Sequence, residues 1–400
     1  ESSTSTSRRL PIENSAVPLY GLVSESLTCE PEHVPGLALG ERAFEIHLAR
    51  RIAAGDVQTA WFDRHGATPR TDLPVGWPDA YRQVVRRRLE AIDTVHEVGL
   101  VERPEYKRRW NEEPWDDQVR RALLAWLLDR LETPAFWPEA RLCSIARLAD
   151  RARHDADLLR VAGLYRGAEA AVGLEELIGE LALAEAVPFL AALRYTASGL
   201  VKRRAWERTW DLQRAEDAID ARTRLPATEP RRLGEGDARD LKAREIGEIP
   251  VPPRYDTRDF RGGAAWRLRG KLDVPKERFI LYPGAERDAD PTPVIGWAGW
   301  DHLQQAQALA SYVVERAEKD GWGADRLTPL LAGIEELLPW LKQWHNERQS
   351  EYGMGMGDYF ERFLDEQVRS LGIAREALRS WAPPAAGARR RRSTSRSEEA

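Results

Sequence analysis

The sequence is poor in cysteine and methionine and has no long apolar run. Cys29 and Cys143, its only cysteines, lie far apart and match no metal-binding or redox spacing, which disfavours a disulfide framework. We expect both to be reduced core residues. No stretch approaches the roughly 18 apolar residues of a membrane span and no secretory signal opens the chain, so the sequence predicts a cytoplasmic protein. Because the chain starts at Glu1 rather than at a methionine, we expect a fragment or a processed product.

The sequence also lacks the common catalytic motifs. Seven histidines are present, but none forms an HExxH pair. There is no GxSxG nucleophile turn, no GxxxxGK[ST] phosphate loop and no GxGxxG after a predicted strand. We therefore assign no catalytic residue, no cofactor-binding residue and no metal ligand. A small independent enzyme is the least favoured interpretation.

The composition indicates a folded protein of more than one module. The chain has 400 residues, of which 42% are hydrophobic and 31% are charged, which is enough for a core and a solvated surface. The net charge is −5, so the chain as a whole is not a polycation. Any contact with nucleic acid must therefore come from local basic patches.

Hydrophobic periodicity predicts a mainly α (α+β) fold, with a helical body and a small β-hairpin element in a C-terminal module. We expect a disordered N-terminus (1–15), a helical domain (16–223), a linker or long loop (224–248), a C-terminal module (249–382) and a disordered basic tail (383–400). In the module, runs at 279–282 and 294–298 predict the hairpin.

Three helices should follow the hairpin. The first covers about 300–319. The second is predicted to start with Thr328 as N-cap and Pro329 in the first turn. The third is predicted to begin at Asp358, in a capping-box arrangement with Glu361, and to end at Gly372.

Residues 254–278, called the basic segment below, are the most cationic part of the interior sequence. Eight cations stand against four anions, and Gly and aromatic residues are interleaved with them. Arginine forks bind phosphate and glycine permits close backbone approach, so this pattern is typical of a phosphate-contacting loop. A salt-bridged structural loop is the alternative. The DNA-binding candidates are Arg254, Arg258, Arg261, Trp266, Arg267, Arg269, Lys271, Lys276 and Arg278.

Tryptophan is unusually abundant, with 15 residues, many of them beside charges. Such rings can serve as stacking platforms for unstacked bases or for arginine. Most of them also lie on predicted apolar helix stripes, which favours a packing role. Trp266 is the best candidate for a binding role because it belongs to the basic segment.

Several long strings of mixed chemistry resemble one known family. They include GLALGERAFEIHLARR (36–51), ERPEYKRRWNEEPW (102–115), WRLRGKLDVPKERFILYPG (266–284) and LTPLLAGIEELLPWLKQWHN (327–346). The chain is similar, over roughly 16–382, to the C-terminal region of the adenine-specific DNA methyltransferases of the phage growth limitation system, in its type 2 bacteriophage exclusion (BREX) form.

In that family, S-adenosylmethionine and the catalytic Asn-Pro-Pro-Tyr-type loop lie in a methyltransferase domain N-terminal to this region. The nearest strings here, VPPRY (251–255) and APPAA (382–386), lack the polar and aromatic residues of such a loop. The resemblance therefore implies a non-catalytic part that contributes DNA binding or target recognition. Its partners would be double-stranded DNA, the N-terminal methyltransferase domain and other defence-system proteins. The alternative is a protein-interaction scaffold that docks the methyltransferase onto those proteins.

Overall fold

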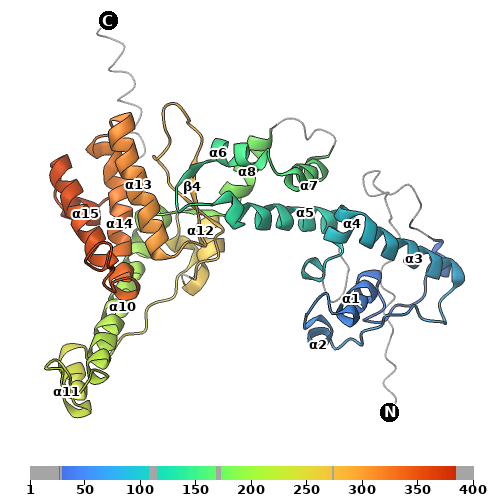
Figure 1. Ribbon diagram of the computed structural model, residues 1–400, viewed down its shortest axis with the longest axis horizontal. Helices are drawn as coiled ribbons and strands as arrows, with labels where there is room; N and C mark the ends of the chain where they lie inside the picture. The colour runs from blue at the N-terminus through green and yellow to red at the C-terminus, as the bar shows by residue number, and fades with distance from the viewer. Residues whose placement is uncertain (1–26, 28, 108–114, 168–172, 273, 384–400) are drawn as a thin grey trace, which may run out of the picture. The chain divides into compact units, whose positions relative to one another are not determined.

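A computed structural model describes residues 27, 29–107, 115–167, 173–272 and 274–383. The chain is mainly helical with one small sheet, which confirms the predicted fold class (Figure 1). It divides into two compact units. The first takes the described residues up to Leu131 together with Ala152–Leu174, and the second takes Glu132–Arg151 together with the described residues from Glu175 onward.

The first unit is built of short helices around small apolar clusters. Phe44, Leu48 and Trp61 form one such cluster, and Ile46, Trp77 and Tyr81 belong to another. The fourfold spacing of Phe44, Leu48 and Ile52 predicts a helix that starts near Glu41 and stops at Gly55. This helix is present as α1, and it ends at Gly55, whose φ of 83° favours glycine. The elements are η2 (Pro31–His33), α1 (Ala43–Ala54), α2 (Trp61–His65), α3 (Asp79–Thr94), α4 (His96–Val101), η3 (Pro104–Tyr106), α5 (Trp115–Leu131) and α7 (Ala156–Arg166).

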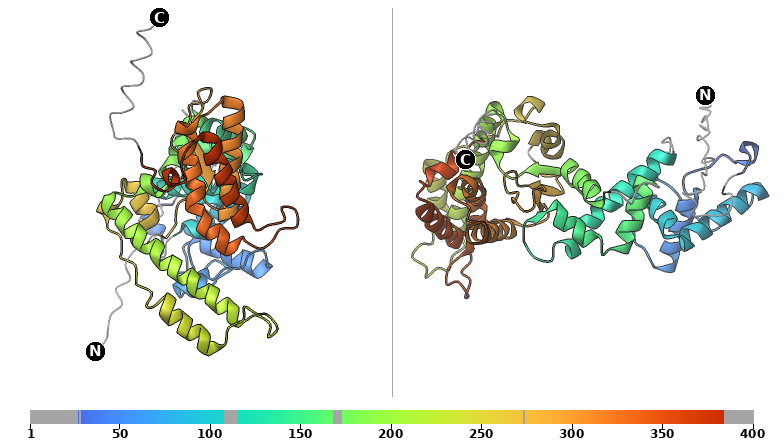
Figure 2. Two further views of the ribbon diagram at one scale, coloured as in Figure 1. Left: turned by 90° about the vertical axis from the view of Figure 1, so that its left-hand side faces the viewer. Right: turned by 90° about the horizontal axis from the view of Figure 1, so that it is seen from above.

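The second unit combines the sheet with a group of long helices. Helices α13, α14 and α15 lie side by side, and α11 packs on α10 (Figures 1 and 2). The helices are η4 (Pro134–Phe136), α6 (Ile145–Ala152), α8 (Leu174–Ala184), α9 (Ala191–Arg194), α10 (Ala197–Thr223), α11 (Glu235–Glu245), η5 (Thr257–Asp259), α12 (Gly263–Arg269), η6 (Gly270–Leu272), α13 (His302–Asp320), α14 (Ala324–Trp344), α15 (Met356–Leu371) and α16 (Glu376–Arg379).

The sheet has four short strands in the order β1-β4-β3-β2. The predicted hairpin is present as β3 (Phe279–Leu281) and β4 (Val294–Trp297), which pair antiparallel. Two further strands come from much earlier in the chain: β1 (Cys143–Ser144) pairs antiparallel with β4, and β2 (Ala186–Pro188) pairs parallel with β3. These strands have only two and three residues, too few for a periodic signal in the sequence.

The expected domain boundaries differ from those of the structure. Residues 224–248 were expected to form a linker or long loop, but helix α11 occupies Glu235–Glu245 and packs on α10 within the second unit. Its one buried residue, Ala238, is too weak a signal to indicate a helix. The division between units also falls outside 224–248. The expected disordered ends, 1–15 and 383–400, lie outside the described residues apart from Pro383.

Two helices begin at residues other than those that the capping signals predict. Helix α14 begins one turn before Thr328, whose hydroxyl donates to the Ala324 carbonyl instead of capping. The buried Leu327 extends the apolar stripe into this extra turn. Helix α15 begins at Met356, not at Asp358, and the Asn346 side chain accepts a hydrogen bond from the Asp358 N–H. Its predicted end at Gly372 is confirmed.

Both cysteines are free thiols, as expected, but only Cys143 is buried, and Cys29 is partly exposed. Burial raises the pKa of the Cys143 thiol, so the sulfur stays protonated at neutral pH. Within the described ranges, no helix combines the length and the apolar content that crossing a membrane requires.

Gly199 in α10 lets the basic segment lie against this helix. A Cβ atom placed on Gly199 would lie 2.1 Å from the Asp259 carbonyl oxygen and 3.0 Å from Cβ of Tyr195. The nearest atom is a backbone carbonyl oxygen of η5. A side-chain rotation therefore cannot relieve the clash. Gly199 is therefore required for this close approach.

We expect Gly199→Ala to lower the free energy of unfolding by about 2 kcal/mol, because over-packing forces the backbone apart. Urea unfolding followed by circular dichroism measures this change. The matched control is Gly179→Ala in α8, where the added Cβ meets only the Ile145 side chain at 3.5 Å. The control should be neutral or stabilising by about 0.5 kcal/mol. Equal losses in both variants would contradict the proposed close approach.

Candidate DNA interface

The basic segment is a folded part of the second unit and not an open loop. It contains η5, α12 and η6 and leads into β3. Its apolar side chains are buried in one cluster with residues from β2, from α9 and from the C-cap of α9: Val187, Ala191, Tyr195, Tyr255, Phe260, Ala265 and Leu268. Trp266 is partly buried against this cluster and lies edge-on to Phe260, with ring centroids 5.5 Å apart. Its position supports a packing role for this ring.

Asp259 is the main polar anchor of the segment. Its side chain is fully buried and accepts hydrogen bonds from the Ser198 hydroxyl (2.8 Å), the Lys202 ammonium (2.5 Å) and the Asp256 N–H (2.6 Å). Burial disfavours the charged carboxylate, but these three donors outweigh burial and hold the pKa of Asp259 below its ordinary value of 3.8. The two α10 donors therefore fasten the segment to that helix.

Four of the predicted DNA-binding cations make contacts within the unit. Arg267 donates to the Glu185 carboxylate at 2.9 Å and to the Ala184 carbonyl. Arg269 pairs with the buried carboxylate of Glu277 at 2.5 Å. The remaining two contacts are Arg278 with Glu132 and Arg261 with the Tyr195 carbonyl, the latter at 2.7 Å. These cations hold the segment in place, as the alternative of a salt-bridged structure predicts.

The other four cations are exposed: Arg254, Arg258, Lys271 and Lys276. Arg258 makes only a loose ion pair with Asp256 at 3.7 Å, and its side chain is 80% exposed. Within the described part of the chain, the side chains of Arg254, Lys271 and Lys276 make no hydrogen bond or ion pair. The structure thus separates the predicted set into four cations with anchoring contacts, of which Arg261 and Arg267 keep exposed surface, and four exposed cations without an anchoring contact.

An aromatic cavity lies beside the segment in the same unit. It has a volume of about 700 Å³, within the range of ligand sites, and α10, α13, α14 and the η6–β3 connection contribute to its wall. Four tryptophans, Trp206, Trp210, Trp300 and Trp340, line it. His302 stacks on Trp340 with centroids 5.5 Å apart and an interplanar angle of 13°. The sequence showed the abundance of tryptophan, but only the fold brings these four rings together.

Glu336 is the acidic group where this cavity meets a second one of about 570 Å³, and it lines both. Its carboxylate accepts a hydrogen bond from the Ala191 N–H at 3.2 Å. The side chain keeps exposed surface, yet the protein packed around it desolvates the carboxyl group and raises its pKa, against the smaller opposing effect of Arg194 and Arg203. A carboxyl group with a raised pKa in a cavity is a common property of binding sites.

These features define a mainly helical protein with a small sheet, whose second unit presents four fixed, exposed cations beside an aromatic cavity. Among the described residues, no group of three or more His, Cys, Asp or Glu side chains is arranged to hold a metal ion.

Comparison with known proteins places the chain in a family. It belongs to the family described as a domain of unknown function (DUF7008), which matches residues 14–393. It is 44% identical over 381 residues to the adenine-specific methyltransferase PglX of Streptomyces coelicolor. This alignment covers 93% of the chain but only 29% of the relative, in a C-terminal part of it. The resemblance noted from the sequence is confirmed. No solved structure matches the chain.

We expect Asp259→Asn to destabilise the protein by about 2 kcal/mol at pH 7, because Lys202 loses its charged partner. A carboxylate with a lowered pKa contributes stability above its ordinary pKa of 3.8, and that contribution disappears as the pH falls through the lowered value. The difference between wild type and variant should therefore shrink in acid. Urea unfolding at pH 7 and pH 3 tests this, with Asp240→Asn, an exposed acid on α11, as control. A difference that is independent of pH would argue against the anchor.

Glu336→Gln should stabilise the protein at neutral and high pH, in contrast to Asp259→Asn. A carboxyl group with a raised pKa binds its proton more tightly in the folded state, so its charged form destabilises the fold as the pH rises above the ordinary value of 4.5. Glutamine removes this charge and can still accept from Ala191. Because the side chain is partly exposed, solvent screens this effect, and we expect a small rise in Tm over wild type at pH 8 and no change near pH 4. The control is Glu318→Gln on the exposed face of α13. A Tm that falls at every pH would show that the charged carboxylate is needed for stability.

Proposed function

We propose that this chain is a non-catalytic part of a site-specific adenine-N6 DNA methyltransferase of a bacterial anti-phage defence system, and that it contributes DNA binding and target recognition. The relative that it matches is named an adenine-specific methyltransferase, and the chain spans 29% of that protein's length. In this proposal an N-terminal methyltransferase domain binds S-adenosylmethionine and transfers the methyl group. The absence of a cofactor loop and of a catalytic loop from the sequence is consistent with this division.

The observation that carries the proposal is the set of four exposed cations on a fixed framework. Arg254, Arg258, Lys271 and Lys276 belong to a segment that Asp259 and the apolar cluster hold against α10. The anchored backbone holds these side chains on the segment, and each cation that neutralises a DNA phosphate releases counterions. A net charge of −5 for the chain makes such a local cationic surface the favoured place for duplex contact.

We expect the combined substitution of Arg254, Arg258, Lys271 and Lys276 by Gln to weaken duplex binding at least tenfold at low salt. The slope of log affinity against log salt should become shallower by about 3.6, because each of the four lost phosphate contacts contributes about 0.9. Fluorescence anisotropy over a salt series measures both quantities. Substituting Arg267 or Arg269 is less informative, because their partners Glu185 and Glu277 would be left unpaired.

The matched control replaces four exposed arginines outside the segment, Arg224, Arg232, Arg239 and Arg244, by Gln. It removes the same charge from the region of α10 and α11. If the two variants lose equal affinity, only the net charge matters, and the basic segment has no specific role in DNA contact.

A second candidate function is docking onto another protein of the defence system. Exposed apolar side chains in and next to the basic segment favour it: Val251 is 93% exposed, Leu272 51% and Val274 49%. Apolar contacts resist salt, whereas phosphate contacts do not. A partner that stays bound at high salt in the absence of DNA would support docking, and binding of duplex alone that falls steeply with salt would support the first function.

A further inference from the structure

A small arginine-rich pocket lies in the second unit, away from the basic segment. It has a volume of about 100 Å³, and its wall comes from residues 141–151, from the loop between β3 and β4 and from α13. Five guanidinium groups line it, with only two carboxylates, those of Asp290 and Glu315. The arginines are Arg141, Arg147, Arg151, Arg287 and Arg316.

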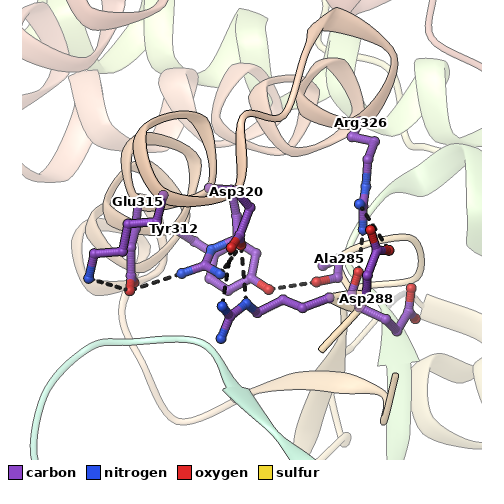
Figure 3. Close-up of polar contacts among 10 residues, drawn as sticks. Ala285, Asp288, Tyr312, Glu315, Asp320 and Arg326 are labelled. Atoms are coloured by element: carbon purple, nitrogen blue, oxygen red, sulfur yellow. Dashed lines mark hydrogen bonds and ion pairs between the residues drawn. The ribbon is translucent and has the colours of Figure 1, made fainter. Parts of the chain in front are cut away.

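The inner wall of the pocket is rigid. Arg316 is 2% exposed and forms ion pairs with Asp320 and, at 2.9 Å, with Glu315, while Arg287 binds both oxygens of Asp320 at 3.1 Å. Figure 3 shows these contacts around the labelled Asp320 and Glu315. The nearby Tyr312 hydroxyl donates to the Ala285 carbonyl at 2.6 Å. The wall is therefore already organised before any ligand arrives.

Hydrogen-bond donors exceed acceptors at this wall. The Arg316 Nε is buried and has no partner among the described residues. A buried donor without a partner is unfavourable, which shows that this wall is short of oxygen acceptors. The carboxylates of Asp320 and Glu315 contact the terminal nitrogens of Arg316, together with Arg287 and Lys319, and not its Nε.

The outer rim adds exposed cations. The Arg147 side chain makes no hydrogen bond or ion pair within the described ranges, and its charge helps to hold the pKa of Asp290 below its ordinary value, after the stronger effects of Ser144 and Thr292. Arg151 donates to the Phe136 carbonyl at 2.5 Å, and Arg141 pairs with the exposed Glu139 at 2.6 Å. Asp290 accepts hydrogen bonds from Thr292 and contributes one negative charge, against the positive charges of Arg147 and Arg151.

We infer that this pocket binds one phosphate group. Five arginines and two acids line the pocket, and Asp320 and Glu139 behind the lining balance part of this positive charge. The forked donors of Arg147 and Arg151 at the rim match the oxygens of a tetrahedral anion. Its small volume admits such a group but leaves no room for the base of a nucleotide. The phosphate can belong to a DNA backbone or to a soluble ester, and both present the same oxygens. This inference depends on the pocket alone and not on the proposed role of the basic segment.

The first test is the binding of inorganic phosphate by the full chain. Calorimetry and thermal unfolding, with chloride at equal ionic strength as reference, should show saturable binding and a rising Tm. Arg147→Gln should weaken phosphate affinity at least tenfold. The affinity of Arg147→Lys should lie between those of wild type and Arg147→Gln. Arg239→Gln, at an exposed arginine on α11, should leave affinity unchanged. No saturable binding, or equal affinity in wild type and Arg147→Gln, overturns the inference.

The second test identifies the source of the phosphate. If the pocket holds a DNA phosphate, Arg147→Gln weakens duplex binding and inorganic phosphate competes with duplex at constant ionic strength. If it holds a soluble ester, Arg147→Gln weakens phosphate binding alone. The variant with four Gln substitutions in the basic segment should retain phosphate binding in either case. These variants therefore test phosphate binding in the pocket and DNA contact by the basic segment independently of each other.

Discussion

The buried carboxylate of Asp259 determines how the basic segment is presented. It joins the segment to Ser198 and Lys202 of α10 and also binds the Asp256 N–H within the segment. A buried charge must keep its partners, so the segment cannot move away from α10 without leaving the carboxylate or the ammonium unpaired. Gly199 completes the joint by allowing the two backbones to approach. The cations that remain exposed are consequently held at defined positions.

Some cations of the basic segment form ion pairs within the protein, and others stay exposed. The position of distant acids determines which cations are paired. Arg267 and Arg278 meet Glu185 and Glu132, which lie 82 and 146 residues earlier in the chain. Such long-range pairs restrain the fold and leave less cationic surface than the composition suggests. The charge of the segment is therefore a poor measure of its capacity for DNA. The exposed subset is the relevant quantity, because only exposed cations can exchange counterions for phosphate.

The second unit contains three separate features with the chemistry of nucleic-acid ligands. The exposed cations and the arginine-rich pocket suit phosphate, and the tryptophan-lined cavity suits planar rings. The chain belongs to the DUF7008 family and is similar to part of a protein named an adenine-specific methyltransferase. In the function proposed above, this part binds DNA and another part performs the methyl transfer.

The sequence by itself determined the fold class, the hairpin, the end of α1 at Gly55, the end of α15 at Gly372 and the family, because these depend on local periodicity, on glycine at helix ends or on long specific strings. Tertiary structure alone decided the start of α14, where burial of Leu327 outweighs the capping signal of Thr328 and Pro329. It also decided the pairing of β1 and β2 with the hairpin and the partner of each arginine. The reason is the same throughout: these outcomes depend on contacts between residues far apart in the chain, and neither spacing nor composition records such contacts.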